Sequence, residues 1–233
     1  MHKKIITLTF YILGFIFIIG CQTTNTTLMI DDPEFNLHDM QNKTVYITPA
    51  QIVENNIPKQ TQITVIKPND MFDSQNLDVD LQTLLAQNFT EGLDFFTVRT
   101  INKSFIIENN NGTQVIIPTV KIDNHYRARA NDDFRINKVL TAGCDFVFVP
   151  LALQLDAVDN VNKPYKSIDL VEPGFKASIN YVVYDVSKNK IAASGVLIGT
   201  AEKSGMIDNT LGRNAILLAM NNAIRNLLEE FRK

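Results

Sequence analysis

Residues Cys144–Leu155, CDFVFVPLALQL, form an almost wholly apolar stretch, and this stretch decides the fold. A strand with apolar side chains at both odd and even positions is covered on both faces of its sheet. Pro150 interrupts the run, and because proline has no backbone N–H we expect a bulge or a strand end there. The stretch therefore predicts a central strand with a layer of structure on each side.

The residues that follow predict a hairpin and a long helix packed beside this strand. Phe175–Asp185 alternates apolar and polar side chains, which is typical of a β-strand. Val186–Lys190 is the expected turn, and Ile191–Thr200 returns as the next strand. Leu211–Phe231 repeats apolar residues at helical spacing and predicts a helix. The polar residues 156–172 predict a loop after the central strand.

Short strands and one helix are predicted upstream of the central strand. The β-rich runs are Thr44–Thr48, Gln62–Lys67 and Phe95–Ile101. Lys103–Glu108 and Thr113–Pro118 flank the sequence NNNG, whose residues accept the positive φ of a hairpin turn. The predicted helix ends at Gly92 and presents one apolar face, formed by Leu77, Leu81, Leu84, Leu85 and Phe89.

This order of elements indicates an α+β fold in a single domain, residues 44–233. We expect a mainly antiparallel or mixed sheet with helices packed on it. The hairpin at 175–200 argues against an all-parallel, doubly wound sheet. Residues 120–141 carry many charges with weak periodicity, and we expect them to be helical.

The N-terminus has the features of a secretory signal peptide, residues 1–20. Lys3 and Lys4 precede an apolar run, Ile5–Ile19, that is short for a bilayer span of about 20 residues. The full chain has 22 basic and 25 acidic residues and a net charge of −3. Without Lys3 and Lys4 the net charge is −5. This balance argues against a nucleic-acid binder and leaves no polybasic segment for a lipid surface.

The end of the apolar run, Ile18-Ile19-Gly20-Cys21, resembles the bacterial lipobox. The resemblance implies cleavage between Gly20 and Cys21, a diacylglyceryl group on the Cys21 thiol, and an acyl chain such as palmitate on the new amine. Gln22 stands where inner-membrane lipoproteins usually carry Asp, which favours the outer membrane over other bacterial membranes or a Gram-positive surface. The alternative is an uncleaved N-terminal helix with a chance cysteine.

Residues 21–43 are polar, contain Pro33 and show no sustained period. They predict a lipidated N-terminus followed by a flexible tether that lifts the domain off the membrane. The alternative is that part of this segment packs on the domain through Phe35 and Leu37.

No motif for catalysis, metal binding or nucleotide binding is present. His38 and His125 have no paired-histidine spacing, and we expect both at the surface. We therefore expect no enzyme, no cofactor and no metal, with an enzyme kept as a distant third class. Acidic residues after the central strand could bind a cation, although a solvated loop is favoured. These are Asp156, Asp159, Asp169 and Glu172.

Two further features have a simple and a functional interpretation. Cys144 is favoured as a buried small hydrophobic residue over a nucleophile or an intermolecular disulfide, because no basic residue stands near it in sequence. Arg127 and Arg129 could hold an anion or a partner carboxylate, but a solvated helix face is favoured.

The C-terminal part also has a recognisable layout. The segment GCDFVFVPL at 143–151, the hairpin NYVVYDVSKNKIAASG at 180–195 and the final helix resemble the TolB N-terminal-like or CsgG-like α/β module of bacterial lipoproteins. Small periplasmic lipoproteins of unknown function and LpoB-type activators of peptidoglycan synthases share this module. The resemblance implies non-enzymatic work in an envelope protein complex, at the periplasmic face of the outer membrane.

We consider two functions from these observations. The first is a lipid-anchored scaffold or accessory subunit, docking through sheet edges or through the hairpin at 103–118. Its candidate docking residues are Phe105, Ile107, Val115 and Ile117. The second is a binding module for a small ligand or a cell-wall component, in a pocket under the 156–172 loop. A pore-forming member of the CsgG-like family is disfavoured, because the arms of the hairpin at 103–118 are shorter than the 9–11 residues of a membrane-spanning strand. The oligomeric state stays open.

Overall fold

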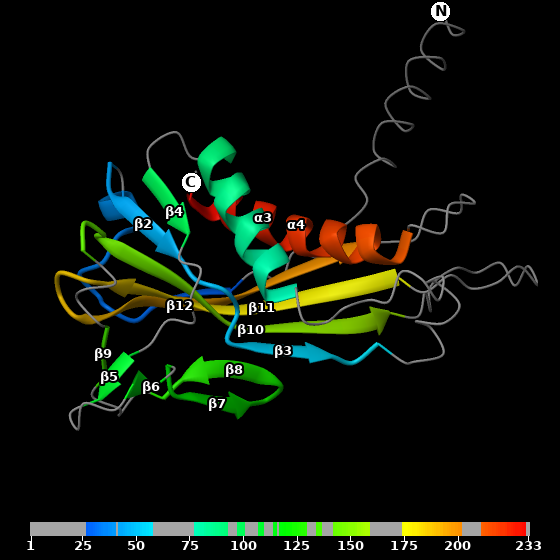
Figure 1. The fold of residues 1–233 in the computed structure, drawn as a ribbon, viewed down its shortest axis with the longest axis horizontal. Coiled ribbons are helices and arrows are strands. Elements are labelled where there is room, and N and C mark those ends of the chain that lie inside the picture. The colour runs from blue at the N-terminus through cyan, green and yellow to red at the C-terminus, as the bar shows by residue number, and fades with distance from the viewer. Residues whose placement is uncertain are drawn as a thin grey trace, which may run out of the picture.

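A seven-stranded mixed sheet with helices on one face forms the centre of the molecule (Figure 1). The computed structural model describes residues 27–40, 42–57, 77–92, 97–100, 107–109, 114–115, 117–129, 134–136, 142–158, 174–201 and 211–231. The strand order is β1-β12-β11-β10-β2-β4, and β3 also pairs with β10. The strands are β1 (Thr27–Ile30), β2 (Thr44–Ile47), β3 (Ile52–Asn55), β4 (Thr97–Thr100), β10 (Phe146–Val158), β11 (Gly174–Asp185) and β12 (Lys190–Ala201). The predicted α+β class is confirmed.

β10 is the central strand, as its apolar sequence predicts. It pairs antiparallel with β11 along one edge, and on its other edge it pairs parallel with β2 and then with β3. Its register with β11 shifts between Pro150 and Ala152, so the bulge expected at the proline is present. The backbone N–H of Gln51, between β2 and β3, donates to the Pro150 carbonyl (3.1 Å). The proline thus marks the point where one neighbouring strand replaces another.

The predicted hairpin that follows β10 is also confirmed. β11 and β12 pair antiparallel from Phe175 opposite Ala201 to Asp185 opposite Lys190. The turn is held by Asp185, whose Oδ1 accepts hydrogen bonds from the backbone N–H groups of Ser187 (2.8 Å) and Lys188 (2.9 Å). Such side-chain bonds to the following backbone stabilise tight turns.

Two helices cover one face of the sheet and pack on each other (Figure 1). They are α3 (Leu77–Gly92) and α4 (Leu211–Phe231), where the sequence predicts helices. Phe148 of β10 lies in this core. Its ring packs edge-on against the ring of Phe89 in α3, with 5.3 Å between ring centroids, and stacks on the ring of Tyr181 in β11, with 4.9 Å between ring centroids. Among the described residues, no helix is long and apolar enough to cross a membrane.

A hairpin and a small sheet lie on the opposite face of the central sheet (Figure 1). The hairpin pairs β7 (Thr119–Ile122) with β8 (His125–Ala128). The small sheet has the strand order β6-β5-β9. Its strands are β5 (Ile107–Asn109), β6 (Gln114–Val115) and β9 (Phe134–Ile136). A second hydrophobic core separates them from the central sheet: Ile117, Cys144, Val147, Val149, Leu151, Val182 and Tyr184.

The helix predicted at 120–141 is wrong. Thr119–Ile122, His125–Ala128 and Phe134–Ile136 are strands. Asp123 and Asn124 both adopt positive φ (48° and 64°), the backbone of a two-residue hairpin turn that Asn and Asp tolerate. The strand predicted at 62–67 lies outside the described residues, and β3 at Ile52–Asn55 was not predicted.

The tether predicted through residue 43 is also wrong from Thr27 onward. β1 pairs antiparallel with β12, from Thr27 opposite Val196 to Ile30 opposite Ala193. A 3-10 helix, η1 (Leu37–Met40), follows. Phe35 and Met40 are buried in the main core, where the Phe35 ring packs edge-on against Phe146 (5.9 Å). The domain therefore begins near Thr27 rather than at 44, because the apolar residues of this segment fill the end of the core.

The burial of Phe35 confirms part of the alternative, in which this segment packs on the domain through Phe35 and Leu37. The side chain of Leu37 lies outside what the structure describes, as do the signal peptide at 1–20 and residues 21–26. The predicted boundary at 44 failed because two buried apolar side chains in a polar segment produce no periodicity.

Gly199 of β12 sets how closely α4 approaches the sheet. A Cβ placed on it would lie 2.2 Å from the Ala219 carbonyl oxygen and 2.3 Å from the Ala223 backbone nitrogen, both in α4. We therefore expect Gly199→Val to push α4 off the sheet and to lower the free energy of unfolding by about 3 kcal/mol.

Urea unfolding followed by circular dichroism measures this change. The matched control is Thr200→Val on the neighbouring, exposed position, for which we expect a change within about 0.5 kcal/mol. Equal unfolding midpoints for the two variants would contradict the close packing of α4.

Candidate functional site

Only some of the predicted site residues lie in the part of the chain that the structure describes. Gly20, Cys21 and Phe105 lie outside the described residues, so lipidation at Cys21 stays a prediction. Ile107 and Val115 stand opposite each other in the β5–β6 pair, which supports the predicted hairpin around NNNG. The positions of their side chains lie outside what the structure describes.

Ile117 does not belong to an exposed docking surface. It is only 1% exposed and packs in the second hydrophobic core under the central sheet. The hairpin pattern alone suggests an accessible apolar face, but the central sheet covers this end of it. Ile117 is therefore removed from the candidate docking residues, and it stabilises the domain instead.

The other chemistry-bearing residues have structural surroundings. Cys144 is buried, and its thiol donates to the Phe146 carbonyl (2.8 Å), which supports the interpretation as a small core residue. Asp156 accepts a hydrogen bond from the Asn56 side-chain amide (3.0 Å), and the other three residues of its acidic group lie outside the described segments. Arg127 lies on an exposed strand position rather than on the expected helix face. Within the described ranges, no three His, Cys, Asp or Glu side chains are grouped to hold a metal ion.

His38 and His125 lie in different parts of the fold. His38 is in η1, near the N-terminus of the domain, and His125 begins β8 on the other face of the sheet. The side chain of His38 lies outside what the structure describes, while His125 is half-buried. Neither position reveals an arrangement that would make a catalytic pair.

A partly exposed polar cluster around Glu54 clamps the β7–β8 hairpin to the sheet. Both Glu54 carboxylate oxygens accept from Lys121 Nζ, and Tyr126 Oη also donates to Glu54. Gln154 Nε2 donates to the same carboxylate (2.8 Å), and Asn180 accepts from the Tyr126 backbone N–H (2.9 Å). The hydrogen bonds from Lys121 and then Tyr126 lower the pKa of Glu54 below its usual value. These hydrogen bonds favour the charged carboxylate and join the hairpin to β3 and β10.

A second ionic cluster holds the N-terminal segment in place. Asp32 is 3% exposed and pairs with Lys188 (2.9 Å) and Lys190 (3.1 Å) at the β11–β12 turn. The backbone N–H of Glu34 donates to the same carboxylate (3.1 Å). The hydrogen bond from Lys188 is the main cause that lowers the pKa of Asp32 to about 2, and burial opposes it. The cluster joins the end of β1 to the turn of the central hairpin.

β1 itself is an edge strand with exposed apolar side chains. It ends the order of the central sheet, and among the described strands only β12 pairs with it. Met29 and Ile30 are 48% and 53% exposed, although both are large and apolar. An edge strand of this kind is available for contact with another chain or with a membrane.

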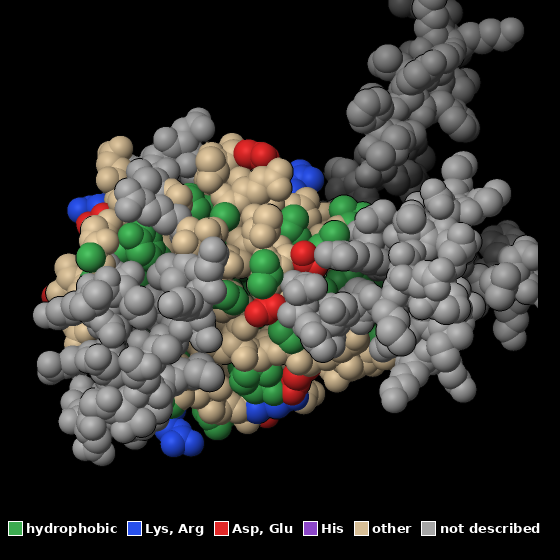
Figure 2. All heavy atoms as spheres, in the orientation of Figure 1, with side chains coloured by type: hydrophobic (Ala, Val, Ile, Leu, Met, Phe, Trp, Pro, Cys, Tyr) green, Lys and Arg blue, Asp and Glu red, His purple; other side chains and the backbone are tan. Residues whose placement is uncertain are grey.

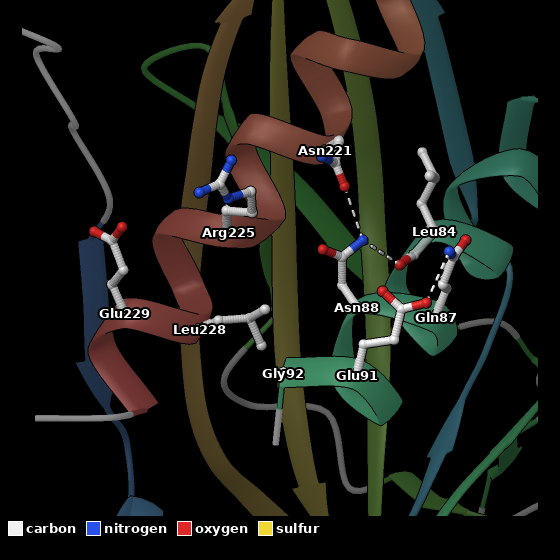
Figure 3. A pocket seen from close by; sticks show the side chains of 9 residues that line it. All are labelled: Leu84, Gln87, Asn88, Glu91, Gly92, Asn221, Arg225, Leu228 and Glu229. Carbon is white, nitrogen blue, oxygen red and sulfur yellow. Dashed lines mark hydrogen bonds between the residues drawn. The ribbon is translucent and has the colours of Figure 1, made fainter. Parts of the chain in front are cut away.

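A polar groove lies between the C-terminal halves of the two helices (Figure 3). Its volume is about 590 Å³, and its floor is crossed by a hydrogen bond from Asn88 of α3 to Asn221 of α4 (2.8 Å). Glu91 on one wall accepts from Gln87 (3.0 Å), and Arg225 stands exposed on the other wall. The remaining lining residues are Leu84, Gly92, Leu228 and Glu229. One cation, carboxylates and amides in one groove suit a small polar ligand that carries both charges.

The sequence predicts the helix that carries Asn221 and Arg225 but does not predict the groove. The groove exists only because α3 and α4 pack side by side, and the residues of its floor stand 133 positions apart in the chain. The surface seen in Figure 2 shows acidic and basic side chains of the described residues scattered rather than gathered in one large patch of a single sign.

The Asp32 cluster predicts a specific acid sensitivity. Because the pKa of Asp32 is about 2 in the folded chain against 3.8 in its ordinary state, its stabilisation is complete above about pH 4. It is lost as the pH falls through the window from 3.8 to about 2. We expect Asp32→Asn to be less stable than the parent at pH 5, with the difference shrinking across this window.

Urea unfolding at a series of pH values measures the difference. Glu34→Gln is the matched control, since Glu34 is 79% exposed and lies 3.8 Å from Lys188. A gap between parent and Asp32→Asn that stays constant down to pH 2 would show that the Asp32 carboxylate does not carry the effect.

Comparisons with known proteins give fold-level neighbours at low similarity. No family model and no curated protein matches the chain. A PelC dodecamer from Paraburkholderia phytofirmans is 10% identical with a TM-score of 0.39, covering 87% of this chain and 96% of that one. A hypothetical protein from Chlamydia trachomatis is 12% identical (TM-score 0.36, coverage 82% and 93%). A minor lipoprotein from Acinetobacter baumannii is 10% identical (TM-score 0.33, coverage 81% and 91%).

Proposed function

We propose that this chain is a lipid-anchored protein of the bacterial envelope that acts as a non-enzymatic scaffold or accessory subunit of an envelope assembly. The observation that carries the proposal is the position of β1. Thr27, its first residue, follows the lipobox cysteine, Cys21, by six residues and is already paired with Val196 of β12. The folded domain thus begins almost directly after the residue that would carry the lipid.

The distance that six residues span determines where the domain sits. A fully extended chain covers at most about 3.3–3.6 Å per residue, so Thr27 lies within about 20 Å of the Cys21 α-carbon. A domain of about 200 residues has a radius of gyration of about 17 Å. The anchor therefore holds the domain against the membrane surface instead of suspending it on a long tether. We assign it to the periplasmic face of the outer membrane, on Gln22.

The sheet supplies a means of contact with other subunits. Its order ends at β4 on the side away from β1, and among the described strands β4 pairs only with β2. An edge strand offers backbone N–H and C=O groups to a strand of another chain. An activator of a peptidoglycan synthase is a narrower form of the same proposal.

The lipid anchor makes the first test. We expect Cys21→Ser to remain an unprocessed, unacylated precursor, because the thiol that accepts the diacylglyceryl group is gone. Intact-mass spectrometry of the purified protein detects both the retained residues 1–20 and the missing acyl mass. In the same cells, crosslinks of the parent protein to membrane-complex subunits should be lost from Cys21→Ser.

Cys144→Ala is the matched control, because it removes the other cysteine of the chain, which is buried. It should be cleaved and acylated like the parent. Normal processing of Cys21→Ser would overturn the anchor, and an acylated parent that crosslinks to no envelope protein would overturn the accessory role alone.

The groove between α3 and α4 favours a second candidate function, a binding module for a small cell-wall component. Arg225 provides a guanidinium that can pair with a ligand carboxylate, and Glu91 and Glu229 provide partners for an amine. Peptide fragments of the cell wall carry both groups. This groove differs from the pocket predicted under the 156–172 loop. Residues 156–158 are the end of β10 rather than loop, and the rest of the predicted loop lies outside the described residues.

A thermal-shift measurement with muropeptides tests this candidate. At a ligand concentration ten times Kd, binding to the folded state adds about 1.4 kcal/mol and raises Tm by about 3–5 °C. We expect Arg225→Gln to abolish the shift, while Arg127→Gln, on the opposite side of the sheet, retains it. A flat response of the parent protein across muropeptides would remove the candidate.

A further inference from the structure

We infer that the outer edge of β1 rests on the lipid bilayer and that Met29 and Ile30 contact its headgroup region. The inference rests on the proposed lipid anchor at Cys21 and adds the surface by which the domain meets the membrane. It concerns residues that the sequence assigns to a flexible tether and that the structure places in the central sheet.

The reach of the chain limits which surface can face the lipid. Thr27 lies within about 20 Å of the anchored residue, and the polar layer of one leaflet is about 5–8 Å deep. Met29 is two residues further along the same strand, so it can be only about 7 Å further away. The β1 end of the sheet therefore stays within about 27 Å of the anchored residue and can reach the membrane surface, whichever way the rest of the domain turns.

The chemistry of this edge suits an apolar, interfacial contact. Met29 and Ile30 are adjacent residues, both about half exposed. Because neighbouring strand residues point to opposite faces, one of the two is usually buried in the core. Here neither is covered, because β1 is the last strand of the sheet. Of the large exposed apolar side chains in the described residues, these two are the pair that is adjacent in sequence.

The edge is also held rigidly enough to present a fixed surface. β1 makes a full set of pairs with β12, and the backbone N–H groups of Asp31 and Asp32 both donate to the Ala192 carbonyl (3.1 Å each). The Asp32 carboxylate pairs with Lys188 and Lys190. These bonds fix the direction of the strand relative to the sheet, so that the anchor orients the whole domain.

Charge does not supply the contact. Lys188 and Lys190 are about half exposed, but their nearest partners are the carboxylates of Asp32 and Glu34. The mature chain has no basic excess that would draw it to anionic lipids. The contact should therefore persist in neutral lipid and at high salt.

The alternative occupant is a strand of a second copy added to β1. Lipid is the better occupant because the anchor places it there in every molecule. A second copy becomes an outcome of the experiment.

The experiment uses the full acylated protein, purified from membranes and reconstituted in phosphatidylcholine vesicles at about one protein per vesicle. Single variants Met29→Cys and Ile30→Cys are labelled with a thiol-reactive fluorophore. Cys21 is blocked by its lipid and Cys144 is only 9% exposed, so the label goes to the new thiol. Leu218→Cys on the outer face of α4 is the matched control, with 48% exposure against 48% for Met29.

Lipids carrying a shallow nitroxide provide the readout. We expect them to quench the label at 29 and 30 by about twofold, since interfacial side chains enter about 5–10 Å into the headgroup boundary, and to leave position 218 unchanged. The quenching should be the same at low and high salt. Circular dichroism confirms that each labelled variant keeps the fold of the parent.

Each other outcome overturns a stated part. Labels at 29 and 30 that behave like the label at 218, on protein whose mass includes the acyl groups, overturn the membrane contact and leave the proposed function standing. If the label at position 29 or 30 becomes protected only at high protein density, a second copy covers the edge. This result overturns the lipid assignment. Quenching lost at high salt overturns the apolar contact. A parent protein without acyl groups overturns the proposed function itself, and the contact with it.

Discussion

Burial of β10 on both faces is the constraint on which the rest of the structure depends. Its side chains enter two different cores: Phe146, Phe148, Leu153 and Leu155 lie in the core under α3 and α4, and Val147, Val149 and Leu151 lie in the core under the β7–β8 hairpin. A strand of this kind cannot stand at an edge, so it requires neighbours on both sides and a layer on each face. Pro150 then divides its outer neighbour into β2 and β3, because the proline removes one N–H from the strand.

The same sheet explains why the N-terminal segment is part of the domain. β12 would be an uncovered edge without β1, and the Asp32 cluster and the ring of Phe35 close the end of the sheet and of the core. This packing changes the functional picture more than any side-chain cluster does. A domain on a long tether could face any direction, whereas with the proposed anchor at Cys21 a domain that begins six residues later would have β1 as its strand nearest to the lipid.

Some of the candidate sites can be predicted from the sequence, and others cannot. The resemblance of residues 18–21 to a lipobox is visible in the sequence because it involves four adjacent residues. The groove with Asn88 and Asn221 could not be predicted, since two helices far apart in the chain form it. Ile117 was misassigned for a related reason: alternation shows that a side chain points to one face but does not show what covers that face. The helix expected at 120–141 failed because its weak period could not compete with the Asp123–Asn124 turn.

Local sequence patterns predict the central strand, the hairpin after it, both helices and the α+β class. In each case apolar residues recur every two or every 3.6 positions within one element, so the pattern is visible among residues close together in the chain. The folded structure is needed to show that Thr27–Met40 belongs to the domain, that Ile117 is interior and that α3 and α4 enclose a groove. These depend on contacts between distant segments, such as Asp32 with Lys188, whose energies leave no periodic pattern in either segment.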